Sequence, residues 1–370
     1  MAEKEKTESK QKLPVMTGAP HIRSGESVPK VMWSVVAALM PAAAFAAYHF
    51  GMPALKLMAV SAAAAVAAEA AIQLLLRKRV TALDGSAVIT GLLLAMNIPP
   101  GAPLWMAGVG SVFAMVIVKH LFGGLGFNIF NPALAARAFL LASWPVHMTT
   151  TWHRFGEHNV LVQNAQNGPG FSPAVFDALT GATPLTLMKE GPKILSDNHI
   201  ALSKLYDLVL SPDMLRSLFI GTVGGSIGET SALLLLIGAL FLMIRKIITW
   251  HIPVSFIGTV ALAAAGYHYL AGFPAPHLMA LYQVLSGGLI LGAFFMATDM
   301  VTSPVSMKGM LIFGAGCGLL TFVIRQWGGY PEGVSYAILI MNAFVPLIDR
   351  YTRPRVFGVR ERKKLAGAAK

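Results

Sequence analysis

Runs of apolar residues recur from residue 31 to residue 348 of this 370-residue chain, and short polar segments separate them. About 20 apolar residues are enough for an α-helix to cross the hydrocarbon core of a bilayer. Hydrophobic residues make up 55% of the chain and charged residues only 12%, which excludes a string of soluble domains. The sequence therefore predicts an all-α polytopic membrane protein. It contains about ten candidate transmembrane segments, at residues 31–50, 57–76, 86–98, 104–122, 132–146, 217–243, 252–271, 281–297, 309–324 and 334–348.

An internal repeat relates the two halves of the chain. Identical residues recur at a constant offset of 205 positions: Pro99 and Pro304, Gly123-Gly124 and Gly328-Gly329, and Ala138-Phe139 and Ala343-Phe344. Each half holds five candidate segments, and an odd number places the second copy upside down in the membrane. We predict two inverted five-helix repeats, at residues 31–146 and 217–348. A chance match is the alternative, because glycine and alanine are abundant in this chain.

Basic residues outnumber acidic ones, 29 against 17, which gives a formal net charge of +12. Lysine and arginine concentrate in the short cytoplasmic loops of membrane proteins. Most basic residues here, including Lys119, fall on one side when the N-terminus is cytoplasmic. We therefore predict a cytoplasmic arm (residues 1–30), a basic cytoplasmic tail (349–370) and an extracytoplasmic loop (147–216). The charge then fixes topology and attracts anionic lipid headgroups, so no nucleic-acid partner is predicted.

Two of the candidate segments are short or interrupted by glycine, and they lie at residues 83–101 and 285–304. Broken helices at matching places in two inverted repeats meet near the membrane midplane and form the binding site in many transporters. The alternative is that the glycines only allow helices to pack closely. Asp84 and Asp299 flank these segments, where each either caps a helix or lines an ion path.

Metal chemistry finds little support in the sequence. Cys317 is the only cysteine, so no disulfide and no all-cysteine metal site can form within the chain. His153 and His158 have a spacing loosely compatible with metal binding, but no carboxylate or cysteine pattern completes a site. We predict no metal site.

The extracytoplasmic loop contains the sequence FDALTGATPLTLMKEG, at residues 176–191. Taken by itself, TGATP is a turn of small residues that exposes the hydroxyls of Thr180 and Thr183, and Pro184 ends any preceding helix. These residues alone assign no function to the loop.

The stretch from Asp177 to Thr183 resembles the flavinylation motif, which reads Asp, two variable residues, Ser/Thr, Gly/Ala, Ala and Ser/Thr. Every fixed position matches, at Asp177, Thr180, Gly181, Ala182 and Thr183. The surrounding chain resembles the RnfD/NqrB family of membrane redox subunits and is closest to RnfD. The family-like segments are DGSAVITGLLLAMNIPPG, KHLFGGLGFNIFNPALAARAF, GSIGETS and GAFFMATDMVTSP, and they cover both halves.

The resemblance implies that Thr183 carries FMN as a covalent phosphoester, on the far side of the membrane. Asp177, Thr180, Gly181 and Ala182 would be recognised by the flavin transferase that attaches it. A noncovalent riboflavin in or beside the membrane core is a further implication.

The family also implies a subunit of an Rnf-type complex in a bacterial cytoplasmic (inner) membrane. That complex relays electrons between ferredoxin and NAD and translocates Na⁺ or H⁺. The chain has no nucleotide-binding fingerprint and cannot ligate an iron–sulfur cluster with one cysteine. We therefore expect it to be inactive alone, and expect membrane, iron–sulfur, NAD-binding and second FMN-bearing subunits as partners.

Polar residues inside the predicted spans need a reason to be there, because burying them in the membrane is costly. Glu229, in the sixth segment, is a candidate for an ion or flavin site. Arg137 either pairs with a carboxylate or meets the electron-rich edge of a flavin. Asn131, like Asn128, either caps the helix that begins at Pro132 or contacts a cofactor. For Glu69, helix packing with a hydrogen-bonded carboxyl is as good an explanation as a functional role.

Two alternative functions stay open at this point. In the first, the chain is the equivalent subunit of the Na⁺-pumping NADH:quinone reductase, and the covalent flavin has the same role. A channel of the urea or ammonium type, also built from inverted five-helix repeats, would need no flavinylation motif.

Overall fold

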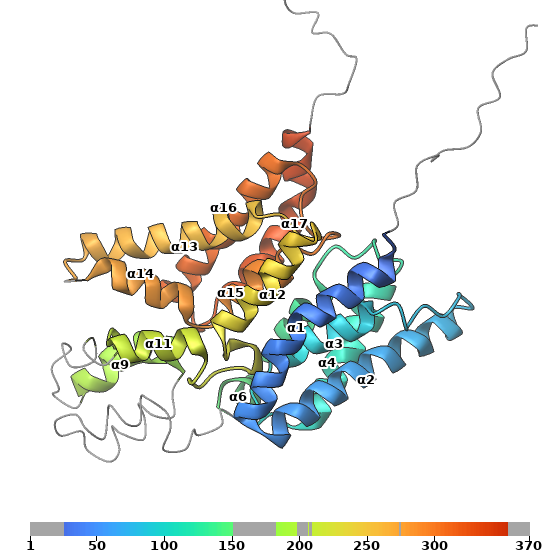
Figure 1. Cartoon of the computed structure of the whole chain (residues 1–370), viewed down its shortest axis with the longest axis horizontal. Helices are drawn as coiled ribbons and strands as arrows, with labels where there is room; N and C mark the ends of the chain where they lie inside the picture. Colours follow the sequence, from blue (N-terminus) through green and yellow to red (C-terminus); the bar gives the residue numbers. More distant parts are fainter. Residues whose placement is uncertain (1–25, 151–182, 198–205, 207–208, 274, 354–370) are drawn as a thin grey trace, which may run out of the picture.

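The computed structural model describes residues 26–150, 183–197, 206, 209–273 and 275–353. The described residues form helices joined by turns, and no strand occurs among them. Their arrangement is shown in Figure 1, where the first half of the chain lies to the right and most of the second half to the left.

The first half begins with two long helices that Gly51 separates, with φ of 72°. A short helix, a longer one and a fifth helix follow. The elements are α1 (Val28–Phe50), α2 (Met52–Leu75), α3 (Ser86–Met96), α4 (Leu104–Phe113) continued by the π-helical η1 (Ala114–His120), α5 (Pro132–Ser143) and α6 (Pro145–Thr149).

The second half has the same order of long, short and long helices, preceded by α9 (Pro184–Asp197) and α11 (Pro212–Ile220). The 3₁₀ turn η2 (Ile227–Glu229) leads into the rest of this half. Its elements are α12 (Ala232–Ile244), α13 (His251–Leu270), α14 (Pro276–Leu285), α15 (Leu289–Leu291), the π-helical η3 (Gly292–Met296), α16 (Met307–Trp327) and α17 (Val334–Thr352).

Both predicted irregular segments are irregular in the structure. The third segment is the 11-residue α3. The eighth segment bends by 65° between α14 and α15, where Gly287 has φ of 68°.

The sixth predicted segment, residues 217–243, is wrong as a single helix. Helix α11 ends at Gly221, whose φ is 108°, and α12 begins only after Ser231, whose hydroxyl accepts from the Leu234 amide. A Cβ on Gly221 would lie 2.5 Å from the Thr230 carbonyl carbon, so the chain folds back on itself here. The hydropathy of this segment is high, but its glycines favour a turn over a helix.

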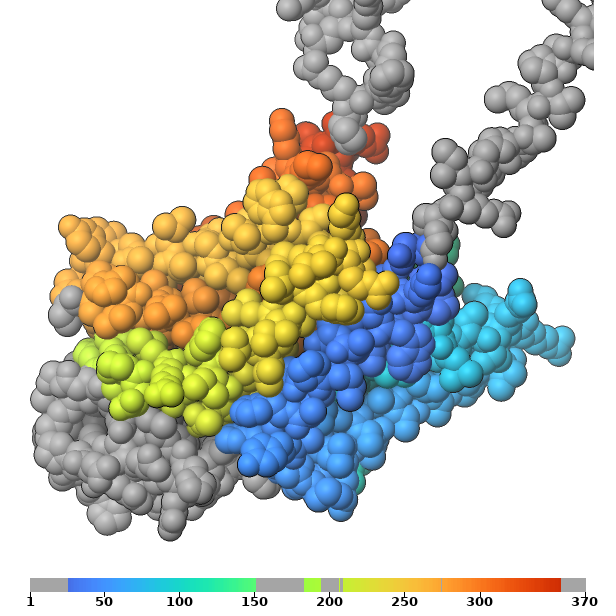
Figure 2. Space-filling model, viewed as in Figure 1, coloured from blue at the N-terminus to red at the C-terminus, as the bar shows by residue number. Residues whose placement is uncertain are grey.

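The packing of helices follows the same plan in each half. Helix α2 packs against α3 and α4, as α13 packs against α14 and α16. Between the halves, α1 packs against α12 and α5 against α17. Figure 2 shows α12, in yellow, lying along α1, in blue. The start of α1 and the end of α17 lie on one side of the molecule, and α9 and α11 lie on the opposite side (Figure 1).

Three helices, α1, α2 and α16, are long and apolar enough to cross a membrane, and the bent pair of α14 with α15–η3 makes up to four. Shorter apolar helices are α3, α4 with η1, α5 and α12. The chain is therefore a multi-pass membrane protein.

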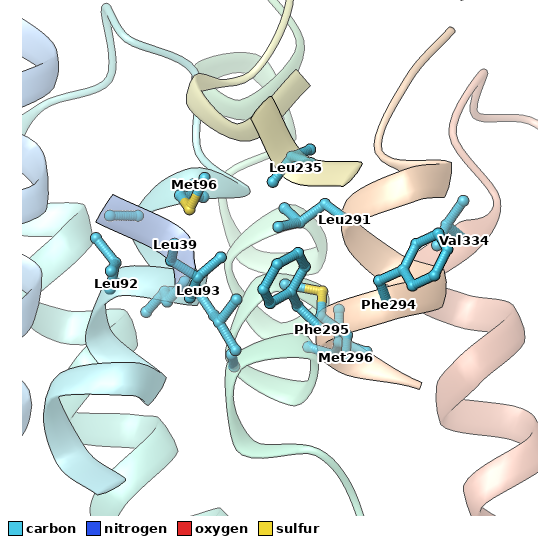
Figure 3. Packing of buried hydrophobic residues seen from close by; sticks show 14 of the residues in the cluster. Leu39, Leu92, Leu93, Met96, Leu235, Leu291, Phe294, Phe295, Met296 and Val334 are labelled. Atoms are coloured by element: carbon cyan, nitrogen blue, oxygen red, sulfur yellow. The ribbon is translucent and has the colours of Figure 1, made fainter. Parts of the chain in front are cut away.

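The centre of the molecule is apolar, and the two short helices meet there. Figure 3 shows Leu93 and Met96 of α3 close to Leu291 and Phe295 of the second half. All four side chains are buried. A Cβ on Gly228 would lie 2.8 Å from the Met96 carbonyl oxygen, so η2 packs against this contact by its backbone.

A Gly91→Ala substitution should separate α3 from α2. A Cβ at Gly91 would lie 2.6 Å from the Ser61 carbonyl oxygen, whereas one at Gly108 of α4 has nothing within 4 Å. We expect Gly91→Ala to destabilise the fold by about 1–3 kcal/mol through overpacking. The measurement is thermal unfolding in detergent, followed by tryptophan fluorescence, with Gly108→Ala as the matched control. Equal unfolding midpoints for the two variants would contradict the close packing.

Candidate functional site

A cavity lies where α1, α3 and α5 approach η3, and we call it the α3 cavity. It has a volume of about 880 Å³, including its open mouth. Its walls are mostly apolar and include Leu93 and Phe294, while Lys119, Asn131 and Asp299 contribute polar groups. A mostly apolar cavity with a few fixed polar groups is typical of small-molecule sites.

The two predicted aspartates at this end of the molecule both hold turns. The Asp84 carboxylate accepts from the Ser86 amide and hydroxyl at 2.8 and 2.6 Å, so it holds the turn that leads into α3. The Asp299 carboxylate accepts from the Val301 amide at 3.4 Å, which holds the turn after η3. Only Asp299 of these two aspartates lines the α3 cavity.

Asn131 caps α5, as the sequence predicts, and also links the two halves. Its side-chain oxygen accepts from the Ala133 and Leu134 amides, and its amide nitrogen donates to the Met296 carbonyl at 3.2 Å. Neighbouring Asn128 donates to Phe130 instead, within its own loop. Asn131 lines the α3 cavity and holds the start of α5 against η3 there.

A buried charge network beside the cavity is absent from the sequence-based predictions. The Lys119 ammonium donates to the Glu69 carboxylate and to the Ser86 hydroxyl, each at 2.7 Å. His120 Nε2 lies 3.4 Å from the same Glu69 oxygen. Both Lys119 and Glu69 are buried, so Lys119 is a core residue rather than an exposed loop charge. The wider turn of η1 places Lys119 and His120 side by side toward α2, and such π-helical turns are frequent at functional sites.

Arg137 of α5 forms another link between the two halves. Its guanidinium pairs with the Glu332 carboxylate and donates to the Ser335 hydroxyl. Of the two predicted alternatives, the structure has the carboxylate partner. Glu229 is not that partner, because its carboxylate accepts from the Ser226 hydroxyl at 2.8 Å in the η2 turn.

Arg325 of α16 holds the break between α14 and α15. Its guanidinium donates to the Gln283 carbonyl and, at 3.0 Å, to the Ser286 carbonyl. Carbonyls at the end of a helix need such partners, because no further turn supplies them. No pattern in the sequence singles out Arg325 for this role.

Thr183 lies at the start of α9. Its hydroxyl accepts from the Thr186 amide at 3.3 Å and lies 2.8 Å from the Thr186 hydroxyl. The side chain is only 3% exposed. The other residues of the predicted motif fall outside the described residues: Asp177, Thr180, Gly181 and Ala182.

Helix α9 is fixed to the second half at two points. The Tyr282 hydroxyl donates to the Pro184 carbonyl at 2.7 Å. The Lys189 ammonium donates to the carbonyls of Gly328 and Tyr330. Partial burial lowers the pKa of Lys189, and the nearby Glu190 carboxylate opposes that shift. These contacts give Thr183 a defined position beside α14.

Within the described part of the chain, no group of three or more His, Cys, Asp and Glu side chains is placed to hold a metal ion. Three candidate sites lie among the described residues. They are the α3 cavity, the buried Glu69–Lys119 network and the start of α9.

Comparison with known proteins places this chain among membrane redox subunits. It is 47% identical to the D subunit of the Na⁺-translocating ferredoxin:NAD⁺ oxidoreductase complex of Acetobacterium woodii, over 95% of this chain and 98% of that protein. It is 45% identical to the D subunit of the proton-translocating ferredoxin:NAD⁺ oxidoreductase complex of Clostridium ljungdahlii, with the same coverage. Identity to the D subunit of the ion-translocating oxidoreductase complex of Stutzerimonas stutzeri is 45%, over 93% of this chain and 96% of that protein. Residues 15–358 match the NQR2, RnfD, RnfE family, and the chain belongs to that family.

Proposed function

We propose that this chain is the membrane-embedded D subunit of an Rnf-type complex, which relays electrons between ferredoxin and NAD⁺ and translocates a cation. The observation that carries the proposal is similarity over nearly the whole chain to relatives named as that component. The relatives' names specify Na⁺ in one case and a proton in the other. Other subunits bind ferredoxin and NAD⁺, so the chain acts as part of an oxidoreductase and is inactive alone.

A covalent FMN at Thr183 fits the geometry at the start of α9. The amide groups of a helix N-terminus favour a phosphate group. A phosphoester on the Thr183 oxygen would stand beside the Thr186 amide and hydroxyl, which already contact that oxygen. Bound FMN supplies electron transfer, while the chain fixes the position of its phosphate. Asp177, Thr180, Gly181 and Ala182 complete the signal that the flavin transferase recognises.

The α3 cavity fits a noncovalent riboflavin. Apolar side chains such as Phe294 and Phe295 suit the faces of an isoalloxazine ring, and Asn131 and Lys119 offer polar groups for its edge. Asp299 and Asn131 of the predicted candidates would contact this flavin. Asp84 would act through the turn that leads into α3, while Arg137 and Glu229 do not line this cavity.

The matching helix order in the two halves supports two inverted five-helix repeats. Elements that correspond in the repeat, α1 with α12 and α5 with α17, pack against each other, as expected about a pseudo-twofold axis. Both described ends lie opposite α9 (Figure 1), which supports cytoplasmic termini and an extracytoplasmic Thr183. The bacterial inner membrane follows from this assignment.

The equivalent subunit of the Na⁺-pumping NADH:quinone reductase is the second candidate, because the family description also names NQR2. The relatives from Acetobacterium, Clostridium and Stutzerimonas are all D subunits, and two of them act on ferredoxin by name, which favours the ferredoxin-linked complex. Nothing in the comparisons favours a urea or ammonium channel.

The test is to purify the complex containing this chain from cells that also make the flavin transferase. We expect reduced ferredoxin to drive NAD⁺ reduction and cation uptake into vesicles that contain the complex, and deletion of this chain to abolish both. Uptake of ²²Na⁺ distinguishes Na⁺ from H⁺, which a pH-sensitive dye reports. A complex that oxidises NADH with quinone but ignores ferredoxin would support the second candidate.

A further inference from the structure

Two short turns of the chain are strongly basic, and we call them the basic turns. The first follows α2 at residues 77–83, and the second follows α12 at residues 245–250. Neither turn contains an acidic residue, and within the described part of the chain none of their cations forms an ion pair. All five cations are exposed: Arg77, Lys78, Arg79, Arg245 and Lys246.

Both basic turns end their helix in the same way. The amides of Arg77 and Lys78 donate to carbonyls in the last turn of α2 at 3.0 and 2.8 Å, and those of Lys246 and Ile247 do the same after α12 at 2.9 and 3.0 Å. This is the Schellman motif, whose left-handed position is usually glycine. Here Arg77 and Lys246 occupy that position, with φ of 53° and 57°, and no other non-glycine residue in the described ranges has a positive φ. A side chain is strained there, so each basic residue needs a reason beyond the shape of the turn.

The two basic turns attach to adjacent residues at the start of α1. Trp33 Nε1 donates to the Leu83 carbonyl, at the end of the first turn, at 3.4 Å. The Arg245 guanidinium, at the start of the second turn, donates to the Ser34 hydroxyl at 2.8 Å. The turns therefore meet at one place and form one basic surface.

The first basic turn is also held from inside the protein. The Gln73 side chain is buried, and it donates to the Thr81 hydroxyl at 2.9 Å and accepts from the Thr81 amide at 2.7 Å. Two hydrogen bonds to one buried side chain fix the path of the turn. Its cations therefore lose little backbone freedom when an anion binds.

Apolar side chains are exposed beside these cations. Leu76, Val80 and Leu83 of the first basic turn and its flank are exposed, and Trp33 is 48% exposed. The turn begins where α2, a helix of membrane length, ends. Tryptophan and basic residues together are typical of the boundary between membrane and water, and clusters of lysine and arginine there attract anionic headgroups. This mixture favours a lipid over a soluble acidic protein as the partner.

We propose that the two basic turns form one binding surface for the phosphate group of an anionic phospholipid, with Arg77 and Lys246 as its fixed cations and Trp33 against the apolar part of the lipid. A bound lipid stabilises the folded chain, because the unfolded chain lacks this surface. The effect extends inward, since Gln73 holds the first turn and also donates to the Glu69 carboxylate at 3.2 Å. The lipid thereby supports the buried Glu69–Lys119 network.

The test uses the full chain, purified in a neutral detergent and titrated with phosphatidylglycerol or phosphatidylcholine. Arg77→Gly combined with Lys246→Gly removes both fixed cations and relieves the strain at both positions. Arg77→Lys combined with Lys246→Arg keeps both charges. The control that removes the same charge elsewhere is Lys56→Gln combined with Arg216→Gln, because both residues are exposed and lie outside the basic turns. Native mass spectrometry measures lipid binding, and thermal unfolding measures stability.

The glycine pair should change the two readouts in opposite directions. Without lipid it should unfold at a higher temperature than wild type, because glycine adopts a positive φ without strain. Its affinity for phosphatidylglycerol should fall about fivefold for each cation removed, which is about 25-fold in the pair. We expect the charge-keeping pair and the control pair to bind this lipid like wild type. Phosphatidylcholine should bind all four proteins equally weakly.

Three results would overturn the inference. Equal affinity of wild type and the glycine pair for phosphatidylglycerol would remove Arg77 and Lys246 from any lipid site. A glycine pair that unfolds at a lower temperature without lipid would show that the two cations serve the helix ends themselves. Glycerol phosphate that binds as tightly as phosphatidylglycerol would show that the surface binds a free phosphate group and does not recognise a lipid.

Discussion

Replacing Thr183 with alanine is expected to abolish the fluorescent FMN band of the denatured chain and to reduce ferredoxin-dependent NAD⁺ reduction to background. The phosphoester needs a hydroxyl, and alanine has none. Intact-mass spectrometry should find a single FMN adduct on the wild-type chain and none on the variant. Peptide mapping should locate the adduct at Thr183.

Two controls separate attachment from folding. Alanine also removes the hydroxyl that caps α9, which costs about 1 kcal/mol. Thr183→Ser keeps both the hydroxyl and the motif, so it should retain the band and the cap. Thr186→Val removes the neighbouring hydroxyl but leaves Thr183, and we expect it to remain labelled. Fluorescence that survives in Thr183→Ala would refute covalent attachment at this residue.

Replacing Lys119 with methionine should destabilise the fold by about 3–5 kcal/mol, because it leaves the Glu69 carboxylate buried without its partner. Glu69 is 1% exposed, so water cannot compensate for the lost ion pair. The effect is measured as the thermal unfolding midpoint of the purified protein in detergent. Lys56→Met is the matched control, because Lys56 is exposed on the same helix as Glu69 and should change stability by less than about 0.5 kcal/mol.

A double variant isolates the pair itself. Glu69→Gln combined with Lys119→Met removes both charges, and we expect it to recover most of the lost stability. An apolar or neutral replacement of a whole buried pair is often tolerated, whereas removing one partner is not. If the double variant is as unstable as the sum of the two single variants, the two residues act independently and the network is wrong.

The sequence predicts the helical parts of this fold well, because apolar segments and helix caps are local signals. Asn131 before Pro132 caps the start of α5, as expected for an asparagine in that position, and Asp84 holds the turn before α3. The short third segment and the glycine-interrupted eighth segment are likewise irregular in the structure.

The missed features all depend on contacts that form only when the chain is folded. Lys119 looks like a loop charge in the sequence, and only its contact with Glu69, 50 residues away, makes it a core residue. The break at Gly221 arises where the chain approaches Thr230 closely, a constraint that hydropathy does not record. Arg325 acquires its role only when α16 packs beside the end of α14.

The turn at residues 328–333 receives one cation from each of two other parts of the molecule. Lys189 of α9 donates to its carbonyls, and Arg137 of the first half pairs with Glu332. The turn works as a shared anchor, because displacing it changes both contacts at once. A movement of α5 against α17 would therefore be passed to α9, which begins directly after Thr183. If Thr183 carries the proposed flavin, we expect these few residues to link rearrangement between the two halves to the position where that flavin is attached.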